Sequence, residues 1–317
     1  MKKLLCMGEA LIDMICTDKG RSLANGENFL KKAGGAPANV AAAVAALGGQ
    51  VEMSAKVGAD PFGQHLLQVM QDMGIGTRFV FADPQHFTTF AFVSLMENGE
   101  RDFYFNRGAD GQLSTDDLAG IPMDEFDMLH FGSATAFLPG PLQHSYRQLL
   151  QQGIDAGMFI SFDPNYRHLL FAQQQASFIE QSWYFMEHCH FFKLSDEEAM
   201  LLTGTATLEA AADELLRRTS STFAITLGAA GTLLRCGAHT QLVGSIPVKP
   251  IDTTGAGDAF VGAVLCQLQQ LPAAQRSMIK LAQWEQIVSN ANKAGARTCE
   301  YMGAMEAFKH LHKSIFD

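Results

Sequence analysis

The chain has 317 residues, of which 47% are hydrophobic and 18% charged, and its formal net charge is −10 at pH 7. This length and apolar content are enough to bury one large core, as in a globular enzyme. An acidic chain without basic clusters is not expected to bind nucleic acid or an anionic membrane surface.

Short apolar runs and amphipathic helical patterns alternate along the chain. The expected strands are residues 4–7, 51–56, 128–131, 158–162, 191–193 and 223–226, and the expected helices are 61–73, 141–152, 197–202 and 208–217. Such βαβ alternation predicts a mainly parallel sheet with helices on both faces. The expected fold class is therefore a doubly wound α/β domain over residues 1–317, with ligands at the carboxyl ends of its strands.

Residues 87–105 interrupt this alternation. Two runs rich in aromatic residues flank the segment Glu97-Asn98-Gly99-Glu100, and this pattern predicts a β-hairpin. A hairpin with so many aromatic side chains needs a cover.

The six cysteines, at positions 6, 16, 189, 236, 266 and 299, form no Cys-x-x-Cys pair, as is typical of reduced thiols. His188, Cys189 and His190 are a candidate metal cluster. On a strand, however, the two histidines would share one face and the cysteine would lie on the other, and no distant ligand set accompanies them. Zinc is not expected there.

Residues 252–265, Asp-Thr-Thr-Gly-Ala-Gly-Asp-Ala-Phe-Val-Gly-Ala-Val-Leu, are the most informative segment. Gly255, Ala256 and Gly257 let an oxyanion approach their N–H groups at the positive end of the helix that follows. A carboxylate would repel that anion, so Asp258 is best explained as a general base that deprotonates a hydroxyl attacking a terminal phosphate. A bare Gly-x-Gly-Asp would instead indicate a turn and an ordinary acidic residue at a helix start.

Residues 33–40, Ala-Gly-Gly-Ala-Pro-Ala-Asn-Val, form a second informative segment and lead into an alanine-rich helix. Gly34 and Gly35 let a polyhydroxylated ligand lie against the backbone, and Asn39 offers a donor and an acceptor to sugar hydroxyls. A tight strand-to-helix turn explains the same pattern equally well.

Together the two segments resemble the paired signatures of the PfkB, or ribokinase-like, family of carbohydrate kinases. The resemblance continues at residues 8–13, similar to the family's first strand with its sugar-binding aspartate, at the 57–63 turn, and at the 226–231 nucleotide loop. Within the family, the motifs most similar to those of fructokinases are residues 34–41, 99–101, 107–110, 130–133, 163–167 and 193–198. Kinases of 2-keto-3-deoxygluconate and of aminoimidazole riboside share much of this pattern.

The resemblance implies an ATP-dependent sugar kinase, with fructose to fructose 6-phosphate as the expected reaction and Mg²⁺ as cofactor. Its expected partners are a small sugar and ATP. Residues 10–33 and 86–108 would form a small β lid that covers the sugar, and a homodimer through this lid is expected.

The resemblance also assigns the site residues. Asp258 would be the base, with Gly255, Ala256 and Gly257 as the anion hole. The expected substrate-binding residues are Asp13, Gly34, Gly35, Asn39, Arg107 and Arg167, and the expected nucleotide-binding residues are Lys193, Thr226, Gly228, Gly231 and Asn292. Structural explanations also stay open: a surface cation for Arg107, a salt bridge with Asp163 for Arg167, a turn cap for Asp13, an ordinary strand-turn-strand corner for Thr226, Gly228 and Gly231, and a solvent-facing side chain for Asn292.

For the metals, the resemblance implies that Glu198 anchors Mg²⁺ through water, because Mg²⁺ prefers oxygen ligands and keeps several waters. Ser195 stands where the family's Asn-x-x-Glu motif has Asn, so the Mg²⁺ geometry is an open point. Asp252 and Thr254, with backbone oxygens near Thr298 and Gly303, resemble a monovalent-cation site. Whether K⁺ is required stays open, and Asp252 could equally be a plain turn residue.

Two other functional classes fit the sequence less well. A sugar-binding regulator without phosphotransfer would be expected to have a damaged base or anion hole, whereas residues 255–258 are intact. A Rossmann oxidoreductase is not expected, because no Gly-x-Gly-x-x-Gly follows the first strand. With no signal-peptide pattern and no run of ~20 apolar residues, the expected location is the cytoplasm.

Overall fold

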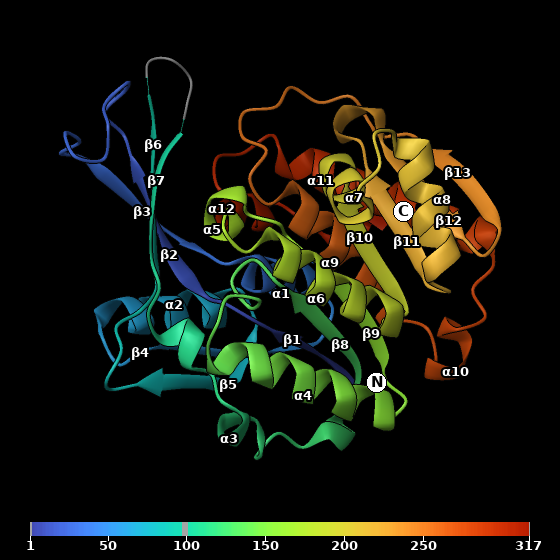
Figure 1. Cartoon of the computed structure of the whole chain (residues 1–317), viewed down its shortest axis with the longest axis horizontal. Helices are drawn as coiled ribbons and strands as arrows, with labels where there is room; N and C mark the ends of the chain where they lie inside the picture. The colour runs from blue at the N-terminus through green and yellow to red at the C-terminus, as the bar shows by residue number, and fades with distance from the viewer. Residues whose placement is uncertain (1, 97–100, 317) are drawn as a thin grey trace.

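The computed structural model describes residues 2–96 and 101–316, which form two sheets with helices packed around the larger one (Figure 1). The large sheet has nine strands in the order β13-β12-β11-β10-β9-β8-β1-β4-β5. Neighbouring strands from β5 to β11 are parallel, and β12 and β13 extend the sheet antiparallel. The strands are β1 (Lys3–Met7), β4 (Val51–Gly58), β5 (Gly76–Asp83), β8 (Phe126–Gly132), β9 (Phe159–Asp163), β10 (Phe191–Ser195), β11 (Thr222–Thr226), β12 (Thr232–Cys236) and β13 (His239–Val243).

Helices cover both faces of this sheet, so the predicted α/β class is confirmed. The β1 side chains alternate between two hydrophobic clusters, with Leu4 and Cys6 on one face and Leu5 and Met7 on the other. The first face packs against α1 (Ala36–Ala46), α2 (Pro61–Asp72), α9 (Ala256–Gln269), α11 (Leu281–Thr298) and α12 (Ala304–Phe308). The second packs against α3 (Thr115–Leu118), α4 (Pro141–Asp155), α5 (His168–Phe171), α6 (Gln175–His188), α7 (Asp196–Thr203) and α8 (Leu208–Arg218), while α10 is the short helix Ala273–Arg276.

The strands and helices predicted from the sequence are present, with small shifts at their ends. One local prediction is wrong. His188 ends α6 and Cys189 is the C-cap of that helix, so the strand geometry considered for this cluster does not apply. Within residues 2–96 and 101–316, no group of three or more His, Cys, Asp or Glu side chains is arranged to hold a metal ion.

Helix α9 is the centre of the first helix layer, between α1 and α11. Gly262 makes this close packing possible, because a Cβ added there would lie 2.6 Å from the Cβ of Ala43 on α1. The close approach of α1 and α9 brings the two signature segments together, since each segment forms the start of one of these helices.

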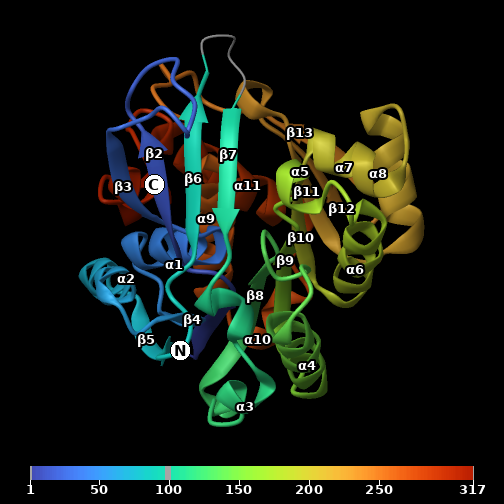
Figure 2. The ribbon, with the colours of Figure 1, turned by 60° about the vertical axis from the view of Figure 1, so that its left-hand side comes forward.

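The second sheet has four strands in the order β3-β2-β6-β7 and stands out from the rest of the molecule (Figures 1 and 2). Its strands are β2 (Leu11–Cys16), β3 (Phe29–Gly34), β6 (Phe90–Leu95) and β7 (Arg101–Asn106). The antiparallel β6–β7 pair is the predicted hairpin. Its predicted turn, residues 97–100, lies outside the described residues.

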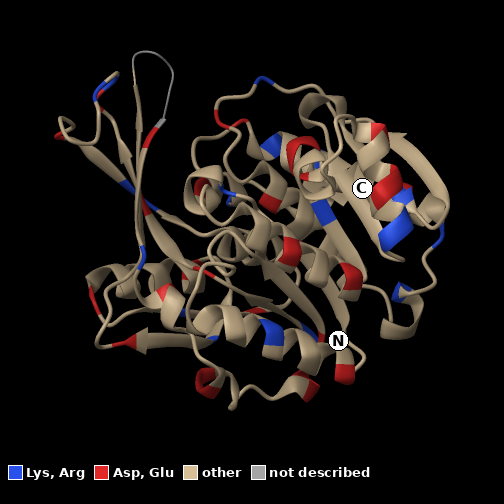
Figure 3. Cartoon of the chain, in the orientation of Figure 1, with Lys and Arg blue, Asp and Glu red and all other residues tan. Residues whose placement is uncertain are grey.

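Charged residues of both signs are interspersed along the ribbon (Figure 3). No helix of the described chain combines the length and the apolar character needed to cross a membrane.

Candidate active site

The candidate site lies where the strand order of the large sheet reverses. From β1 the chain adds β4 and β5 on one side and β8 to β11 on the other. In doubly wound sheets, ligands bind at this switch point, outside the carboxyl ends of the strands. The carboxyl ends of β1, β8, β9 and β10 lead to four polar residues of the site, which are Glu9, Thr135, Asp163 and Ser195 respectively.

The N-terminus of α9 forms the predicted anion hole. Gly255 is its N-cap with φ of 82°, and an added Cβ would lie 2.4 Å from the Cβ of Ala304, so only glycine fits. Ala256 and Gly257 begin the helix, where N–H groups lack intrahelical partners and the helix dipole is positive. The backbone is therefore shaped to receive an oxyanion.

Asp258 is buried in the first turn of α9 and is held by Asn39. The Asn39 Nδ2 donates a hydrogen bond of 2.9 Å to Asp258 Oδ2, which joins the two signature segments across 219 residues of sequence. The other amide atom, Asn39 Oδ1, is buried and has no hydrogen-bond partner among the described residues. A buried acceptor beside a buried carboxylate is suited to a ligand hydroxyl.

The environment of Asp258 adjusts its basicity. Burial raises the pKa of its carboxyl, while the Asn39 hydrogen bond and the positive charges of Arg167 and Lys193 lower it. The net direction is upward, toward the range in which a carboxylate works as a general base near neutral pH.

The Lys193 side chain extends from β10 to the start of α9 and pairs with Asp163. Its Nζ is 3.2 Å from Asp163 Oδ2, and a Cβ added to Gly257 would lie 3.1 Å from the same Nζ. Burial lowers the pKa of Lys193, but the carboxylates of Asp163, Glu198 and Asp258 outweigh it, so the pKa is raised and the ammonium stays charged. A fixed positive charge therefore adds to the anion hole.

Asp163 is a site residue that the sequence reasoning considered only as a salt-bridge partner of Arg167. Burial raises its pKa to about 7 against the lowering effect of Lys193. Its Oδ1 is buried with no hydrogen-bond partner among the described residues. The available signal was its position at the carboxyl end of a predicted parallel strand.

Arg167 lies near three carboxyl groups, of which Glu9 and Asp258 are buried and Asp13 is half-buried. Its charge lowers the pKa values of Glu9, Asp13 and Asp258. Since Asp163 is paired with Lys193, the structural explanation of Arg167 as its salt-bridge partner is wrong. The loop that carries Arg167 contains Asn165 at φ of 52°, the only non-glycine residue with positive φ in the described chain. Such strain is frequent at functional sites.

Asp13 lies against Gly34 of the first signature, but it is not on the first core strand. It lies on β2 of the second sheet, where it is paired with Lys32 of β3. The comparison of residues 8–13 with a single first strand is therefore wrong, and so is the explanation of Asp13 as a cap at a strand end. Gly35 is required, since its φ is 109° and an added Cβ would lie 2.3 Å from the Glu9 carbonyl oxygen. At Gly34 an added Cβ would lie 2.1 Å from Asp13 Oδ2 and would displace that side chain. Burial raises the pKa of Asp13 to about 6.

A buried network that the sequence reasoning missed connects the base of the second sheet to β1. Thr135 donates to Asp110 Oδ2 at 2.8 Å and to Glu9 Oε2 at 3.4 Å, and Thr89 also donates to Asp110. Burial, together with the nearby charge of Asp110, raises the pKa of Glu9 to about 8. These contacts join segments far apart in sequence, so no local motif marked them.

Arg107 is part of this network and is not the surface cation considered from the sequence. It is half-buried, its Nε is 3.8 Å from Asp110 Oδ2, and it donates to the carbonyl oxygens of Thr135 and Pro139. Arg107 thus fixes the end of β7 to the core beside Glu9.

Glu198 and Ser195 form the capping box of α7. Ser195 Oγ accepts from the Glu198 N–H, and Glu198 Oε2 accepts from the Ser195 N–H at 2.8 Å. Glu198 Oε1 accepts from the Tyr166 N–H, which ties the Arg167 loop to α7. Serine therefore has a helix-capping role at the position where the family motif has asparagine.

The predicted nucleotide residues lie on the β11–β12 connection and on α11. Thr226 donates to the Leu194 carbonyl oxygen, and Gly228 and Gly231 have φ of 58° and 104°. Asn292 is buried, so its explanation as a helix residue that faces solvent is wrong. It accepts from Thr232 and donates to the carbonyl oxygens of residues 243 and 244, so it also holds β12 and β13 to α11.

Asp252 and Thr254 form a turn before the anion hole. Asp252 Oδ1 accepts from the N–H and the hydroxyl of Thr254, and Oδ2 accepts from the Gly303 N–H at 2.8 Å. The Asp252 N–H also donates to the carbonyl oxygen of Cys299, the residue after Thr298, so this turn lies beside the end of α11.

The sequence features and the fold have a direct match among known proteins. The pattern of the pfkB family carbohydrate kinase covers residues 1–310. The chain belongs to this family. Among its relatives, the chain is 35% identical to Fructokinase-1 of Oryza sativa subsp. japonica over 307 residues, or 95% of this chain and 93% of that protein.

Two solved structures extend the comparison. A fructokinase with bound ATP from Xylella fastidiosa aligns with a TM-score of 0.87 and 29% identity, covering 100% of this chain and 97% of the other. A double-mutant fructokinase from Vibrio cholerae O395 in a fructose, ADP and potassium ion bound form aligns with a TM-score of 0.84 and 31% identity, covering 100% and 97%. This pfkB-family chain is thus similar to carbohydrate kinases over its whole length.

Proposed function

We propose that this carbohydrate kinase transfers the γ-phosphoryl group of ATP to a primary hydroxyl of fructose and forms fructose 6-phosphate. The observation that carries the proposal is the pairing of Asn39 with Asp258 at the start of α9, beside Lys193. It combines a base, a fixed cation and an anion hole in one buried site. The names and bound ligands of the relatives support the choice of fructose and ATP.

In the proposed reaction, Asp258 takes the proton of the attacking hydroxyl, whose oxygen forms a bond to the γ-phosphorus. The bond from that phosphorus to the ADP oxygen breaks, and ADP leaves with the electron pair. Charge that develops on the transferring group is stabilised by the N–H groups of Gly255 to Gly257 and by Lys193. Asn39 keeps the Asp258 carboxylate oriented toward the hydroxyl.

The sugar would lie between Asp13, the backbone of Gly34 and Gly35, and Asn39. Asn39 Oδ1 is a buried acceptor that a sugar hydroxyl can satisfy. Arg167 is near both Asp13 and Asp258, so it can bridge the sugar and the transferring phosphate. Arg107 acts in this proposal through the Glu9 and Asp110 network, which positions the second sheet.

The second sheet would act as the lid over the sugar, since Asp13 projects from it and water must be excluded from phosphoryl transfer. Ile15, Leu30 and Leu95 are exposed on the sheet face that carries Asp13. Such apolar side chains support a homodimer through the lid. Sedimentation of the wild type against Leu30→Lys tests this, and a wild-type monomer at working concentration would contradict it.

The oxygen-rich surroundings of the phosphate site fit Mg²⁺. Asp163 Oδ1 is buried without a partner among the described residues, and Glu198 lies within the same charge cluster. These two carboxylates would hold the hydrated ion, with Ser195 fixing Glu198 through the capping box. When bound, Mg²⁺ neutralises phosphate charge.

The turn at Asp252 and Thr254 would hold K⁺ beside the anion hole. The proposal is supported by the potassium ion in the Vibrio cholerae fructokinase. In the nucleotide site, Thr226, Gly228 and Gly231 would line the phosphates, and Asn292 would approach the base. Because the Asn292 amide already donates to two backbone carbonyls, its contact with the base requires a shift of the 243–244 segment.

The substrate assignment is tested by a coupled assay of ADP release with Mg·ATP. The acceptors are fructose, 2-keto-3-deoxygluconate, ribose, adenosine and aminoimidazole riboside. The highest kcat/KM is expected with fructose. Preference for another acceptor would contradict the assignment of fructose but not the assignment of phosphoryl transfer. No turnover of any acceptor would favour a regulator that binds sugar without phosphotransfer.

A further inference from the structure

Four buried polar residues from separate segments meet where the second sheet joins the large one. We call them the junction cluster: Glu9 between β1 and β2, Thr89 directly before β6, Asp110 shortly after β7, and Thr135 after β8. Figure 2 shows β2, β6 and β7 leaving the core of the molecule together. The cluster therefore lies at the base of the proposed lid.

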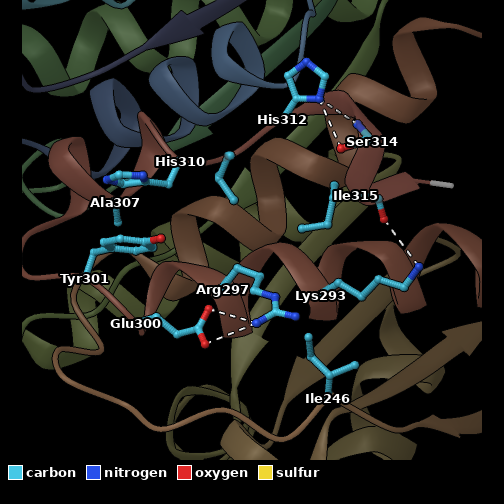
Figure 4. A pocket seen from close by; sticks show the side chains of 11 residues that line it. Ile246, Lys293, Arg297, Glu300, Tyr301, Ala307, His310, His312, Ser314 and Ile315 are labelled. Atoms are coloured by element: carbon cyan, nitrogen blue, oxygen red, sulfur yellow. Dashed lines mark hydrogen bonds and ion pairs between the residues drawn. The ribbon is translucent and has the colours of Figure 1, made fainter.

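The junction cluster is closed to solvent, and each of its residues is at most 1% exposed. It differs in this respect from the cavity of about 360 Å³ against α11, whose walls carry side chains such as Tyr301 and His310 (Figure 4). No member of the cluster lines that cavity. Because a closed cluster leaves no space for a ligand, it acts on function through the elements that it holds together.

Within the cluster, Asp110 is the carboxylate that receives the donors. The Thr89 hydroxyl accepts from the Gly108 N–H at 2.8 Å and donates to Asp110 Oδ1. The Arg107 Nε lies 3.8 Å from Asp110 Oδ2 and has no hydrogen-bond partner in the described parts of the chain. The charge of Arg107 interacts more strongly with Asp110 than with Glu9.

The Thr135 hydroxyl has only one proton for two carboxyl groups. Its Oγ1 is 2.8 Å from Asp110 Oδ2 and 3.4 Å from Glu9 Oε2, and a hydroxyl donates one hydrogen bond at a time. The shorter contact directs that proton to Asp110. Glu9 Oε2 then faces the lone pairs of the Thr135 oxygen, and this contact is attractive only if Glu9 has a proton of its own. The geometry thus favours a neutral Glu9 beside the Asp110 carboxylate.

The charges around Glu9 agree with this arrangement. The charged and titratable groups that face it are Asp110 and Arg107 near the end of β7, Tyr146 on α4, and Arg167 after β9. Burial and the charge of Asp110 raise the pKa of Glu9, whereas two backbone N–H groups and the charge of Arg167 lower it. The net pKa is about 8, so Glu9 holds its proton at neutral pH.

Glu9 connects the two sides of the proposed sugar site. Its Oε1 accepts from the Ala36 N–H at 3.0 Å, at the start of the helix α1 that carries Asn39. Through the junction cluster it is also connected to β6, the neighbour of the strand β2 that carries Asp13. An ionised Glu9 would place two carboxylates around one hydroxyl in a buried site, and their repulsion would separate the second sheet from the start of α1.

We propose that the neutral side chain of Glu9 is a positioning residue for the acceptor sugar, and that loss of its proton moves Asp13 away from Asn39 and weakens the binding of fructose. The inference rests on the proposed function for the identity of the sugar and for the roles of Asp13 and Asn39 in holding it.

The test is isothermal titration of the full chain with fructose at pH 7 and at pH 9, without ATP. Glu9→Gln keeps an acceptor for the Ala36 N–H and supplies a donor to Thr135, but it does not titrate. The matched control is Glu52→Gln. Glu52 is also a buried glutamate, but it pairs with Lys3 at the amino end of β4, away from the junction cluster. Thermal unfolding at both pH values establishes that the three proteins are folded.

The expected change follows from the protonated fraction of Glu9. If only the protonated form binds tightly, the apparent Kd is the intrinsic Kd divided by that fraction, so a pKa of about 8 predicts a Kd about tenfold higher at pH 9 than at pH 7. The wild type and Glu52→Gln should show this rise, and Glu9→Gln should show almost none. In the coupled assay with saturating Mg·ATP, the same rise should appear in KM for fructose, with a much smaller change in kcat.

A wild-type Kd for fructose that changes by less than about twofold between the two pH values would overturn the proposal, whatever the variants do. An equal rise in Glu9→Gln and the wild type would overturn it as well. Because the titration needs no phosphoryl transfer, these outcomes are distinct from a failure of turnover at pH 7, which would contradict the proposed function instead.

Discussion

Replacing Asn39 by alanine removes the amide that donates to the proposed catalytic base. In the structure this hydrogen bond is 2.9 Å long, lies in a buried site and lowers the pKa of Asp258. Its loss should therefore raise the pKa of Asp258, so that the carboxylate is protonated over a wider pH range. A base must be ionised to accept a proton, and activity should be lost at higher pH than in the wild type.

The size of the effect follows from the energy of the lost contact. A hydrogen bond to a charged group contributes about 1.5–3 kcal/mol, and 1.36 kcal/mol corresponds to one pH unit, so the acidic limb of kcat/KM should move up by about 1–2 pH units. The measurement is the pH dependence of kcat/KM in the coupled assay, with fructose as the varied substrate.

Asn290→Ala is the matched control. Asn290 is also a buried asparagine that donates a short side-chain hydrogen bond, to Gln267 at 2.8 Å, but it lies on α11 away from Asp258. It should lose stability without moving the acidic limb. If Asn39→Ala is folded and its acidic limb coincides with that of the wild type, Asp258 is not the group that titrates in catalysis.

Four other changes have measurable outcomes. Gly35→Ala should lower the free energy of unfolding in urea by at least about 3 kcal/mol, because φ is 109° and the new Cβ would lie 2.3 Å from the Glu9 carbonyl oxygen. The control Gly74→Ala, where φ is 79° but the space is open, should lower it by only about 1–2 kcal/mol. Burial raises the pKa of Glu9 to about 8, so the folded protein holds a proton that the unfolded chain releases, and this contribution to stability falls as pH rises from about 4.5 to about 8. Glu9→Gln should remove that slope and be more stable at pH 9 by on the order of 5 kcal/mol, and parallel stability curves would contradict it. Lys193→Met should lower kcat/KM for ATP at least tenfold and cost about 3–5 kcal/mol, since Asp163 loses its buried partner; unchanged nucleotide kinetics would remove Lys193 from the site. Chelation of divalent cations should stop turnover and added Mg²⁺ should restore it, and activity in the chelator would exclude the proposed metal.

The sequence predicted the elements whose patterns are local. Core strands such as β1 and β9 are apolar runs bounded by turns, and α9 begins where a glycine segment meets an apolar helical pattern. The resemblance of the two signature segments to the paired signatures of one family also indicated that Asn39 and Asp258 belong to one site.

The contacts within the site could not be predicted in the same way. Asn39 was expected to bind sugar, and its hydrogen bond to Asp258 depends on how closely α1 and α9 pack at Gly262. Asp13 lies on β2 rather than on the first strand, because the chain leaves the core sheet after Met7 and begins the second sheet at Leu11.

The Glu9, Asp110 and Thr135 network has the same explanation. Its members come from three separate segments, and each is an ordinary polar residue in its own sequence context. Only the meeting of the strand ends at the switch point gives these residues a common environment.

The most direct test of the proposed chemistry is kcat of Asp258→Asn with fructose and saturating Mg·ATP. Asparagine keeps the shape and can still contact Asn39, but it cannot accept the proton. The account predicts that kcat falls by about 10²–10⁴-fold, the usual contribution of a general base, while both KM values change little. A variant that is folded, binds both substrates and retains kcat within a few-fold of the wild type would contradict the assignment of Asp258 as the base.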